Sequence, residues 1–169
     1  MTVTRQFAYS TENKNTIDMV LSLNGIPIVA LELKNQITGQ SVENAKKQFM
    51  YNRNHRELCF QFNKRFLVYF AVDLYEVWMA TELKGKDTFF LPFNQGSGGA
   101  GKVGGAGNPE NSVGYNTAYL WEKILTKDSL INIIQRFLHV SVEKKVIKDG
   151  KETYKASKKL IFLVTINLM

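Results

Sequence analysis

The sequence predicts a single mixed α/β domain in which a central β-sheet is flanked by helices. Apolar and polar residues alternate over residues 16–23, a helical pattern follows at residues 41–53, and helical spacing returns over residues 115–138. The chain of 169 residues is long enough for one core, and its 44% hydrophobic and 22% charged residues are typical of a globular domain. No glycine fingerprint of a dinucleotide-binding fold accompanies the strands.

The amino-acid composition excludes several classes of protein. One cysteine, Cys59, excludes an internal disulfide framework and a zinc site built from several thiolates. The only histidines, His55 and His139, are too far apart to predict a histidine-rich metal site. No apolar run approaches the roughly 18 residues of a membrane span, and no apolar segment at the start predicts a signal peptide. We therefore expect a soluble domain of a reducing compartment, and its net charge of +7 favours an anionic partner.

The first predicted elements form a β-hairpin. Residues 16–23 alternate between apolar and polar side chains, which predicts a half-buried strand. Asn24-Gly25 is a strong hairpin turn signal, and residues 26–34, nearly all apolar until Glu32, predict the second strand. The pattern thus predicts an antiparallel pair that ends in charged residues.

A helix and two more strands are predicted after the hairpin. Residues 36–40 are polar and include a glycine, which indicates a loop. Ser41 is a suitable N-cap for a helix running to about Arg53, with apolar residues on one face. Aromatic and β-branched residues predict further strands at residues 66–72 and 74–81.

The second half of the chain begins with an unusual loop. Residues 96–109 contain seven glycines in fourteen positions, so we expect a mobile loop at about 95–110. Helical spacing returns at residues 115–125 and 128–138. A last strand pair, residues 140–147 and 153–163, is predicted around Asp149-Gly150, as a basic, solvated hairpin.

The residues that indicate chemistry are Asp18, Glu32 and Lys34. In a strand, Glu32 and Lys34 share one face, at the end of an apolar run. Two carboxylates can hold a hard cation such as Mg²⁺ through oxygen ligands. A lysine beside them can orient an attacking water or balance charge on a phosphate. The pattern therefore indicates a metal-dependent phosphodiesterase site, although an E-x-K pair in a strand is more often a solvated edge pair.

The register of the predicted hairpin tests this interpretation. A two-residue loop, Asn24-Gly25, would place Asp18 and Glu32 on opposite faces, and no site would form. A loop one residue longer, Asn24-Gly25-Ile26, places Asp18 across from Glu32 and Met19 across from Leu31. One face is then wholly apolar, and its members are Ile17, Met19, Leu21, Leu23, Val29, Leu31 and Leu33. The hydrophobic pattern thus selects the register that assembles the site.

These residues carry a resemblance to a known family. The stretches at residues 15–21, 23–27 and 31–35 resemble the PD-(D/E)xK nuclease domain of the restriction (R) subunit of type I restriction-modification enzymes. Further similar stretches occur over most of the chain, at residues 38–40, 48–53, 70–73, 89–94, 105–109, 119–121 and 128–130. The resemblance implies a restriction-endonuclease-like α/β fold with a mixed central sheet.

The resemblance also implies site residues. Asp18 and Glu32 correspond to metal ligands, the Leu33 carbonyl is a third oxygen for Mg²⁺, and Lys34 is the catalytic lysine. The helix after the site resembles the glutamine-containing motif of this nuclease group, which makes Gln48 a residue that contacts the site or DNA. The same motif implies a DNA contact for Tyr51. Basic residues cluster in this part of the chain, and among them we expect DNA contacts from Lys46, Lys47, Arg53 and Arg56.

The activity implied is Mg²⁺-dependent cleavage of double-stranded DNA in a bacterial or archaeal cytoplasm. Such a subunit works with a helicase/translocase domain in the same polypeptide and with methylation and specificity subunits. This chain has no complete ATP site, and residues 163–169 depart from the family, so we interpret residues 1–169 as one nuclease domain, a fragment without the ATP-driven motor.

Two alternatives stay open. The same fold can act as a non-catalytic module that binds DNA or docks to a motor. Gly96-x4-Gly101-Lys102 nearly spells a phosphate-binding loop, but Val103 replaces the hydroxyl residue and a further glycine-rich run follows, so we expect a flexible loop instead.

Overall fold

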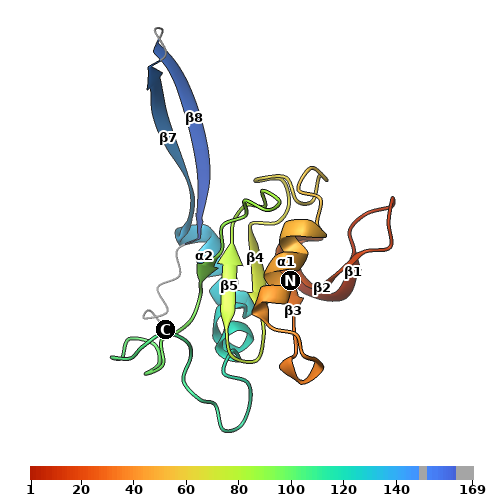
Figure 1. The fold of residues 1–169 in the computed structure, drawn as a ribbon, viewed down its shortest axis with the longest axis vertical. Helices are drawn as coiled ribbons and strands as arrows, with labels where there is room; N and C mark the ends of the chain where they lie inside the picture. Colours follow the sequence, from red (N-terminus) through yellow and green to blue (C-terminus); the bar gives the residue numbers. More distant parts are fainter. Residues whose placement is uncertain (149–151, 163–169) are drawn as a thin grey trace.

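A computed structural model describes residues 1–148 and 152–162 (Figure 1). Its body is a six-stranded sheet in the order β1-β2-β3-β4-β5-β6, in which β3 and β4 are parallel and the other neighbouring strands are antiparallel. The strands are β1 (Thr2–Ala8), β2 (Thr16–Leu23), β3 (Ile26–Leu33), β4 (Val68–Val72), β5 (Val77–Ala80) and β6 (Leu91–Pro92). This mixed sheet confirms the predicted fold class and is compatible with a restriction-endonuclease-like fold.

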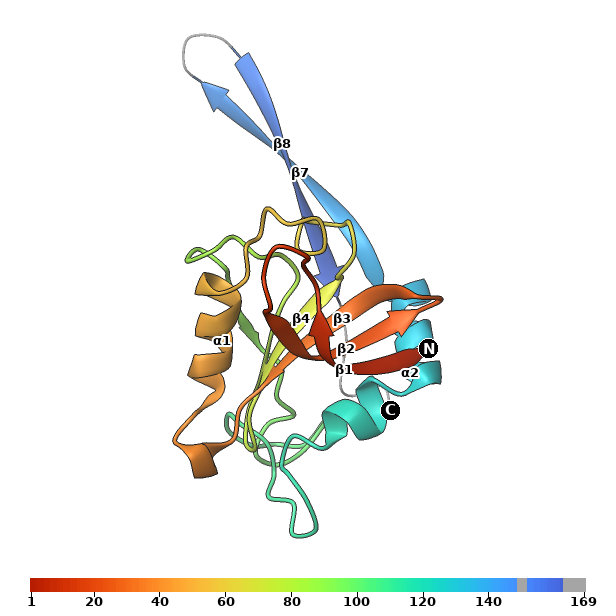
Figure 2. The same cartoon turned by 90° about the vertical axis from the view of Figure 1, so that its right-hand side faces the viewer.

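Helical segments cover both faces of the sheet (Figure 2). They are the 3-10 turn η1 (Gln36–Thr38), the helix α1 (Val42–Tyr51), the π-helical segment η2 (Leu120–Ile124) and the helix α2 (Lys127–Arg136). One apolar cluster joins η2 and α2 to the sheet through Leu120, Ile124, Leu130 and Ile133. A second cluster lies under α1 and includes Val42, Ala45 and Phe49. None of the helices among the described residues is long and apolar enough to cross a membrane.

Helix α1 makes the connection that the parallel pair requires. Parallel neighbours cannot be joined by a tight turn, so the chain must cross one face of the sheet between β3 and β4. The N-terminus of α1 receives the buried carboxylate of Asp73, whose Oδ2 accepts a hydrogen bond of 2.9 Å from the backbone N–H of Val42. Negative charge is favourable at the N-terminus of a helix. Asp73 directly follows β4, so this contact ties α1 to the strand that it precedes.

The β2–β3 register agrees with the prediction away from the turn and differs at the turn itself. Met19 pairs with Leu31 and Leu21 with Val29, as the longer register required. The turn itself has only two residues, because Leu23 pairs with Ile26 and both Asn24 and Gly25 adopt positive φ, 49° and 80°. The extra residue is Ile28 of β3, which lies in a bulge between the Leu21–Val29 and Ser22–Pro27 pairs. The predicted three-residue loop was therefore wrong, because the extra residue lies in the strand and not in the turn. The predicted pairing of Met19 with Leu31 is nevertheless confirmed.

The bulge and the strand end also change which side chains share a face. In the predicted register Ile28 falls on the same face as Glu32, but in the structure it packs in the cluster under η2 and α2. Ile17 packs in the cluster under α1, and Leu33 is 38% exposed, so neither belongs to the predicted apolar face. A residue added to one strand reverses the alternation on that side of the bulge, which accounts for Ile28.

Most other predicted elements are present, with shifted ends. The strands predicted at 66–72 and 74–81 shorten to β4 and β5, and the helix predicted at 115–125 shortens to η2. The predicted last pair is confirmed as β7 (Leu138–Lys148) and β8 (Glu152–Phe162), a long hairpin that projects from the body (Figure 1). Its turn at Asp149-Gly150 lies outside the described residues. Strands β1 and β6 were not predicted.

The glycine-rich loop folds back on itself. The backbone N–H of Gly96 donates to Gly107 at 2.8 Å, and that of Ser97 donates to Gly105 at 2.9 Å. Gly98 and Gly104 approach so closely that a Cβ on either would collide with the backbone of residues 103 or 98. No helix follows Lys102, as a phosphate-binding loop would require. The mobility that the sequence suggests stays a prediction.

The register makes a direct prediction about Leu31. This side chain is 3% exposed in the apolar cluster under η2 and α2, so Leu31→Asp would bury an unpaired charge. We expect the free energy of unfolding to fall by about 4 kcal/mol or more, measured by urea unfolding. Ile26→Asp on the same strand is the matched control, because Ile26 is 51% exposed and should lose about 1 kcal/mol or less. Equal losses in the two variants would contradict the register.

Candidate active site

The ends of β2 and β3 bring Asp18 and Glu32 together. Asp18 lies on β2, and its Oδ2 accepts a hydrogen bond of 2.8 Å from the backbone N–H of Leu33, the residue after Glu32. Met19 and Leu31 form the last pair of the β2–β3 ladder, and Asp18 and Glu32 are the next residues on the two strands. Asp18 is half-buried and Glu32 is fully buried. The structure therefore assembles the two carboxylates that the sequence predicted.

The carboxylate of Glu32 forms a buried ion pair with Arg53. Arg53 follows the C-terminal end of α1 and is 4% exposed. Its Nε and Nη2 donate hydrogen bonds of 2.9 and 2.5 Å to one oxygen, Oε1 of Glu32. Nη2 also donates to the carbonyl of Thr16 at 2.7 Å. A charge taken out of water needs such a partner, because an unpaired carboxylate in the core is strongly destabilising.

The second oxygen of Glu32 has no partner. Oε2 is buried and accepts no hydrogen bond from any residue in the described parts of the chain. Burial raises the pKa of Glu32 to about 7; the Arg53 guanidinium opposes this rise and the neighbouring Asp18 carboxylate adds to it. An oxygen of this kind, beside a second carboxylate, is unusual in a structure where most buried polar groups are satisfied.

This donor set fits a hard divalent cation. Two carboxylates that lie together, one with an unused oxygen, are oxygen ligands of the type that Mg²⁺ takes, with water completing the coordination. The described residues contain no group of three or more histidine, cysteine and acidic residues that could hold a metal. Asp18 and Glu32 would thus need further oxygens, for which the backbone of Leu33 and solvent are the expected sources.

Lys34, two residues after Glu32, forms no ion pair with a described residue. It follows the end of β3 and is half-buried, and its backbone N–H donates to Val72 at 2.8 Å. Within residues 1–148 and 152–162, its ammonium group makes no hydrogen bond or salt bridge. A lysine fixed by its backbone with an unengaged ammonium group is available to an anionic ligand.

Sequence reasoning did not identify Gln6 as a neighbour of Asp18. Gln6 lies on β1, and its Nε2 is 3.4 Å from Oδ1 of Asp18, while its Oε1 accepts a hydrogen bond of 2.6 Å from Thr16. The backbone of Gln6 has a positive φ of 48°, rare for a residue other than glycine. The β-branched residues at positions 2–4 could have predicted this strand.

The predicted helix residues divide into exposed and engaged side chains. Lys47, Tyr51 and Arg56 are exposed. Gln48 is half-buried, and its side chain forms no hydrogen bond with a described residue. Lys46 is 8% exposed: its Nζ is 2.6 Å from the carboxylate of Glu43 and 3.4 Å from the centre of the Trp78 ring.

The expected surface positions of Arg53 and Lys46 are therefore corrected. Both were grouped with surface cations because they lie in a run of basic residues. Both side chains are buried. Arg53 forms an ion pair with Glu32, and the ammonium group of Lys46 lies over the face of the Trp78 ring. Charge spacing along a chain does not reveal which cations turn inward to meet a buried acid.

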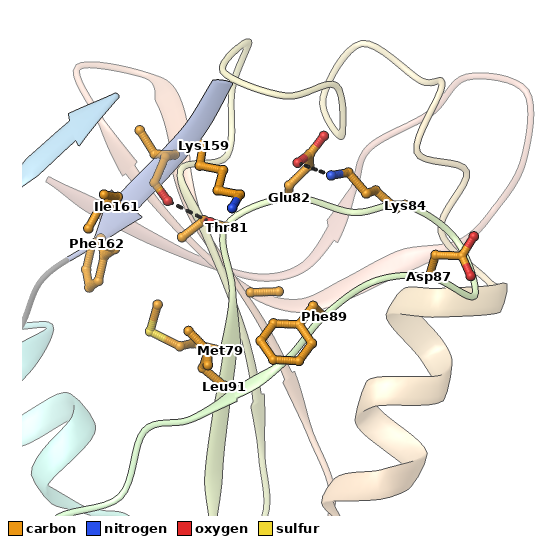
Figure 3. A pocket seen from close by; sticks show the side chains of 12 residues that line it. Met79, Thr81, Glu82, Lys84, Asp87, Phe89, Leu91, Lys159, Ile161 and Phe162 are labelled. Carbon is orange, nitrogen blue, oxygen red and sulfur yellow. Dashed lines mark hydrogen bonds and ion pairs between the residues drawn. The ribbon is translucent and has the colours of Figure 1, made fainter. Parts of the chain in front are cut away.

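A pocket away from the two carboxylates contains none of the predicted site residues. Its volume is about 440 Å³, and it lies between the edge of the sheet at β5 and β6 and the end of β8 (Figure 3). Phe89, Leu91 and Phe162 line it, and Lys84 and Glu82 form an ion pair of 2.8 Å at its rim. Two acids also line it, but Glu82 is paired with Lys84 and Asp87 is exposed, whereas Glu32 is fully buried.

Comparison with known proteins yields one match. A family model described as the type I restriction enzyme R protein N terminus matches residues 1–88. This range includes β1 to β5, α1 and every predicted site residue. The resemblance that we described beyond residue 88 stays a prediction. No curated protein and no solved structure matches the chain.

The burial of Glu32 predicts a pH dependence of stability. A pKa raised from 4.5 to about 7 means that the folded state binds the proton more tightly than the unfolded state. The contribution of Glu32 is thus most favourable below pH 4.5 and is lost as the pH rises through 7. Glu32→Gln cannot titrate, so its stability relative to the wild type should rise between pH 5 and pH 8, by on the order of 2 kcal/mol.

Thermal and urea unfolding at several pH values measure this difference. Glu12→Gln is the matched control, because Glu12 is exposed and its replacement should leave the pH profile unchanged. Parallel profiles for the wild type and Glu32→Gln would contradict the raised pKa.

Proposed function

The chain belongs to the family of type I restriction enzyme R protein N termini, and on this premise we propose that it is a Mg²⁺-dependent DNA endonuclease domain. The observation that carries the proposal is the pair of acids at the ends of β2 and β3, where buried Glu32 keeps one oxygen unpartnered beside Asp18. Lys34 directly follows β3, and its ammonium group forms no hydrogen bond or ion pair with a described residue. Cation ligands together with a positive charge can support metal-dependent cleavage of a phosphodiester bond.

Each residue has a defined role in the proposed reaction. Asp18, Glu32 and the Leu33 carbonyl hold the cation, which when bound polarises the phosphate and makes an attacking water more acidic. Lys34 orients that water and balances the charge that develops on the phosphate oxygens. Gln48, on the helix above the same face, is proposed to contact the site or the DNA.

The surface beside the site is proposed to hold the DNA backbone. Lys47 and Arg56 are exposed and basic, and Tyr51 is 67% exposed. Lysine and arginine side chains supply most of the sequence-independent affinity for DNA through phosphate contacts. We propose that these three side chains contact double-stranded DNA; Arg53 and Lys46, which are engaged internally, are not assigned this role.

The family description places this region in a larger enzyme. We propose that its partners are a helicase/translocase domain of the same subunit and the methylation and specificity subunits of a type I complex, in a bacterial or archaeal cell. ATP would be required by that motor domain and has no role at the acids described above.

The metal site can be tested without DNA. Calorimetric titration of Mn²⁺ or Mg²⁺ into the wild type should show binding that disappears in Asp18→Ala. Nicking of supercoiled plasmid in the same buffers then tests cleavage. Absence of metal binding in both proteins would contradict the catalytic proposal and would favour a non-catalytic domain that binds DNA or docks to the motor.

Lys34 provides the sharper test of chemistry. Lys34→Ala should lower plasmid nicking at least about a hundredfold, because a charge that acts on the transition state is removed. Metal affinity and melting temperature should change little, since Lys34 is half-buried and its ammonium group makes no contact within the described residues. Lys47→Ala is the control: this exposed lysine should affect DNA affinity and its salt dependence but not the rate at saturating DNA. A normal rate for Lys34→Ala would overturn its assigned role.

A further inference from the structure

We propose that Arg53 is a positioning residue of this site, which holds one oxygen of Glu32 so that the other is presented to the cation shared with Asp18. The inference rests on the proposed function and extends it to a residue that does not itself contact the metal or the DNA. Its basis is how the guanidinium is shared among its acceptors, rather than the mere presence of an ion pair.

The contacts of Arg53 are asymmetric. A guanidinium and a carboxylate commonly meet as a fork, in which two parallel hydrogen bonds use both carboxylate oxygens. Here Nε and Nη2 both donate to Oε1, at 2.9 and 2.5 Å, and Oε2 is left without a partner. A buried acceptor left unsatisfied costs about 1–3 kcal/mol, so an arrangement built for stability alone would use both oxygens.

Arg53 also connects the two strands that carry the acids. The last pair of the β2–β3 ladder is Met19 with Leu31, and beyond it the strand ends are joined by the hydrogen bond from the backbone N–H of Leu33 to Oδ2 of Asp18. Arg53 adds a second link. Nη2 of Arg53 donates to the Thr16 carbonyl on β2 at 2.7 Å while it holds Glu32 on β3. The guanidinium thus fixes the distance between the strand ends at the point where the acids lie.

One further donor and one face of the guanidinium are also engaged. Nη1 donates to the carbonyl of Asn52 at 3.3 Å, and the Cζ atom of Arg53 lies 5.4 Å from the centre of the Tyr9 ring. These contacts anchor the side chain to the end of α1 and to the segment after β1. Residues that orient metal ligands in this way commonly change metal affinity when they are replaced.

Arg53→Lys separates positioning from charge. Lysine keeps the positive charge beside Glu32 but has one nitrogen, which cannot hold Oε1 and the Thr16 carbonyl with the geometry of the planar guanidinium. We expect its Mn²⁺ affinity to fall roughly tenfold to a hundredfold in calorimetry, with a broadened electron paramagnetic resonance spectrum for bound Mn²⁺. Plasmid nicking should require correspondingly more Mn²⁺ and recover at saturation.

Arg56→Lys is the matched control. Arg56 lies three residues further along and is exposed, so the same substitution there should leave Mn²⁺ affinity unchanged. If Arg53→Lys does not fold, Tyr9→Leu removes the ring beside the guanidinium without touching Glu32, and should weaken Mn²⁺ binding in the same direction by a smaller factor.

The outcomes separate the two proposals. A wild type that binds Mn²⁺ through Asp18, beside a folded Arg53→Lys that binds equally well, would overturn the positioning role and leave the proposed function intact. A wild type that binds no Mn²⁺ would overturn both. Weakened binding in Arg53→Lys, with Arg56→Lys unchanged, supports the inference.

Discussion

The buried charge of Glu32 is the constraint on which the arrangement around the site depends. A carboxylate with no exposed surface requires a cation brought to it, and the structure supplies Arg53 from just beyond α1. After β3 the chain crosses one face of the sheet as α1, and Arg53 then lies beside Glu32 on β3. The same segment connects the parallel strands β3 and β4. It therefore both makes the crossover between the strands and supplies the cation that pairs with Glu32.

Two buried acids show how structural and functional carboxylates differ in this molecule. Asp73, after β4, uses both oxygens: Oδ1 accepts from the backbone of Tyr75 and Glu76 at 2.8 Å, and Oδ2 accepts from Gln36 and Val42. Its hydrogen bonds hold a turn and a helix N-terminus together. Glu32, on the neighbouring strand, leaves one oxygen unpartnered. The satisfied acid Asp73 organises the fold, whereas in our proposal the unsatisfied oxygen of Glu32, beside Asp18, is a ligand for a cation.

The bulge in β3 shows how local geometry adjusts a hairpin to the requirements of the site. The Asn24-Gly25 turn favours a two-residue loop, which by itself would place Asp18 and Glu32 on opposite faces. The acids need the register that is shifted by one residue. An extra residue at the bulge satisfies both, so the turn keeps its favoured conformation and the acids meet.

The sequence by itself determined the alternating strands, the turn, the helix after them and the pair of acids with the lysine, because periodicity and turn preference are local properties of the chain. Only the tertiary structure decided that Arg53 and Lys46 turn inward, that Gln6 on β1 lies beside Asp18, and where the extra residue of the hairpin sits. Those outcomes depend on which segments meet in space. Burial changes the free energy of a charge far more than its neighbours in sequence do, and burial is a property of the folded whole.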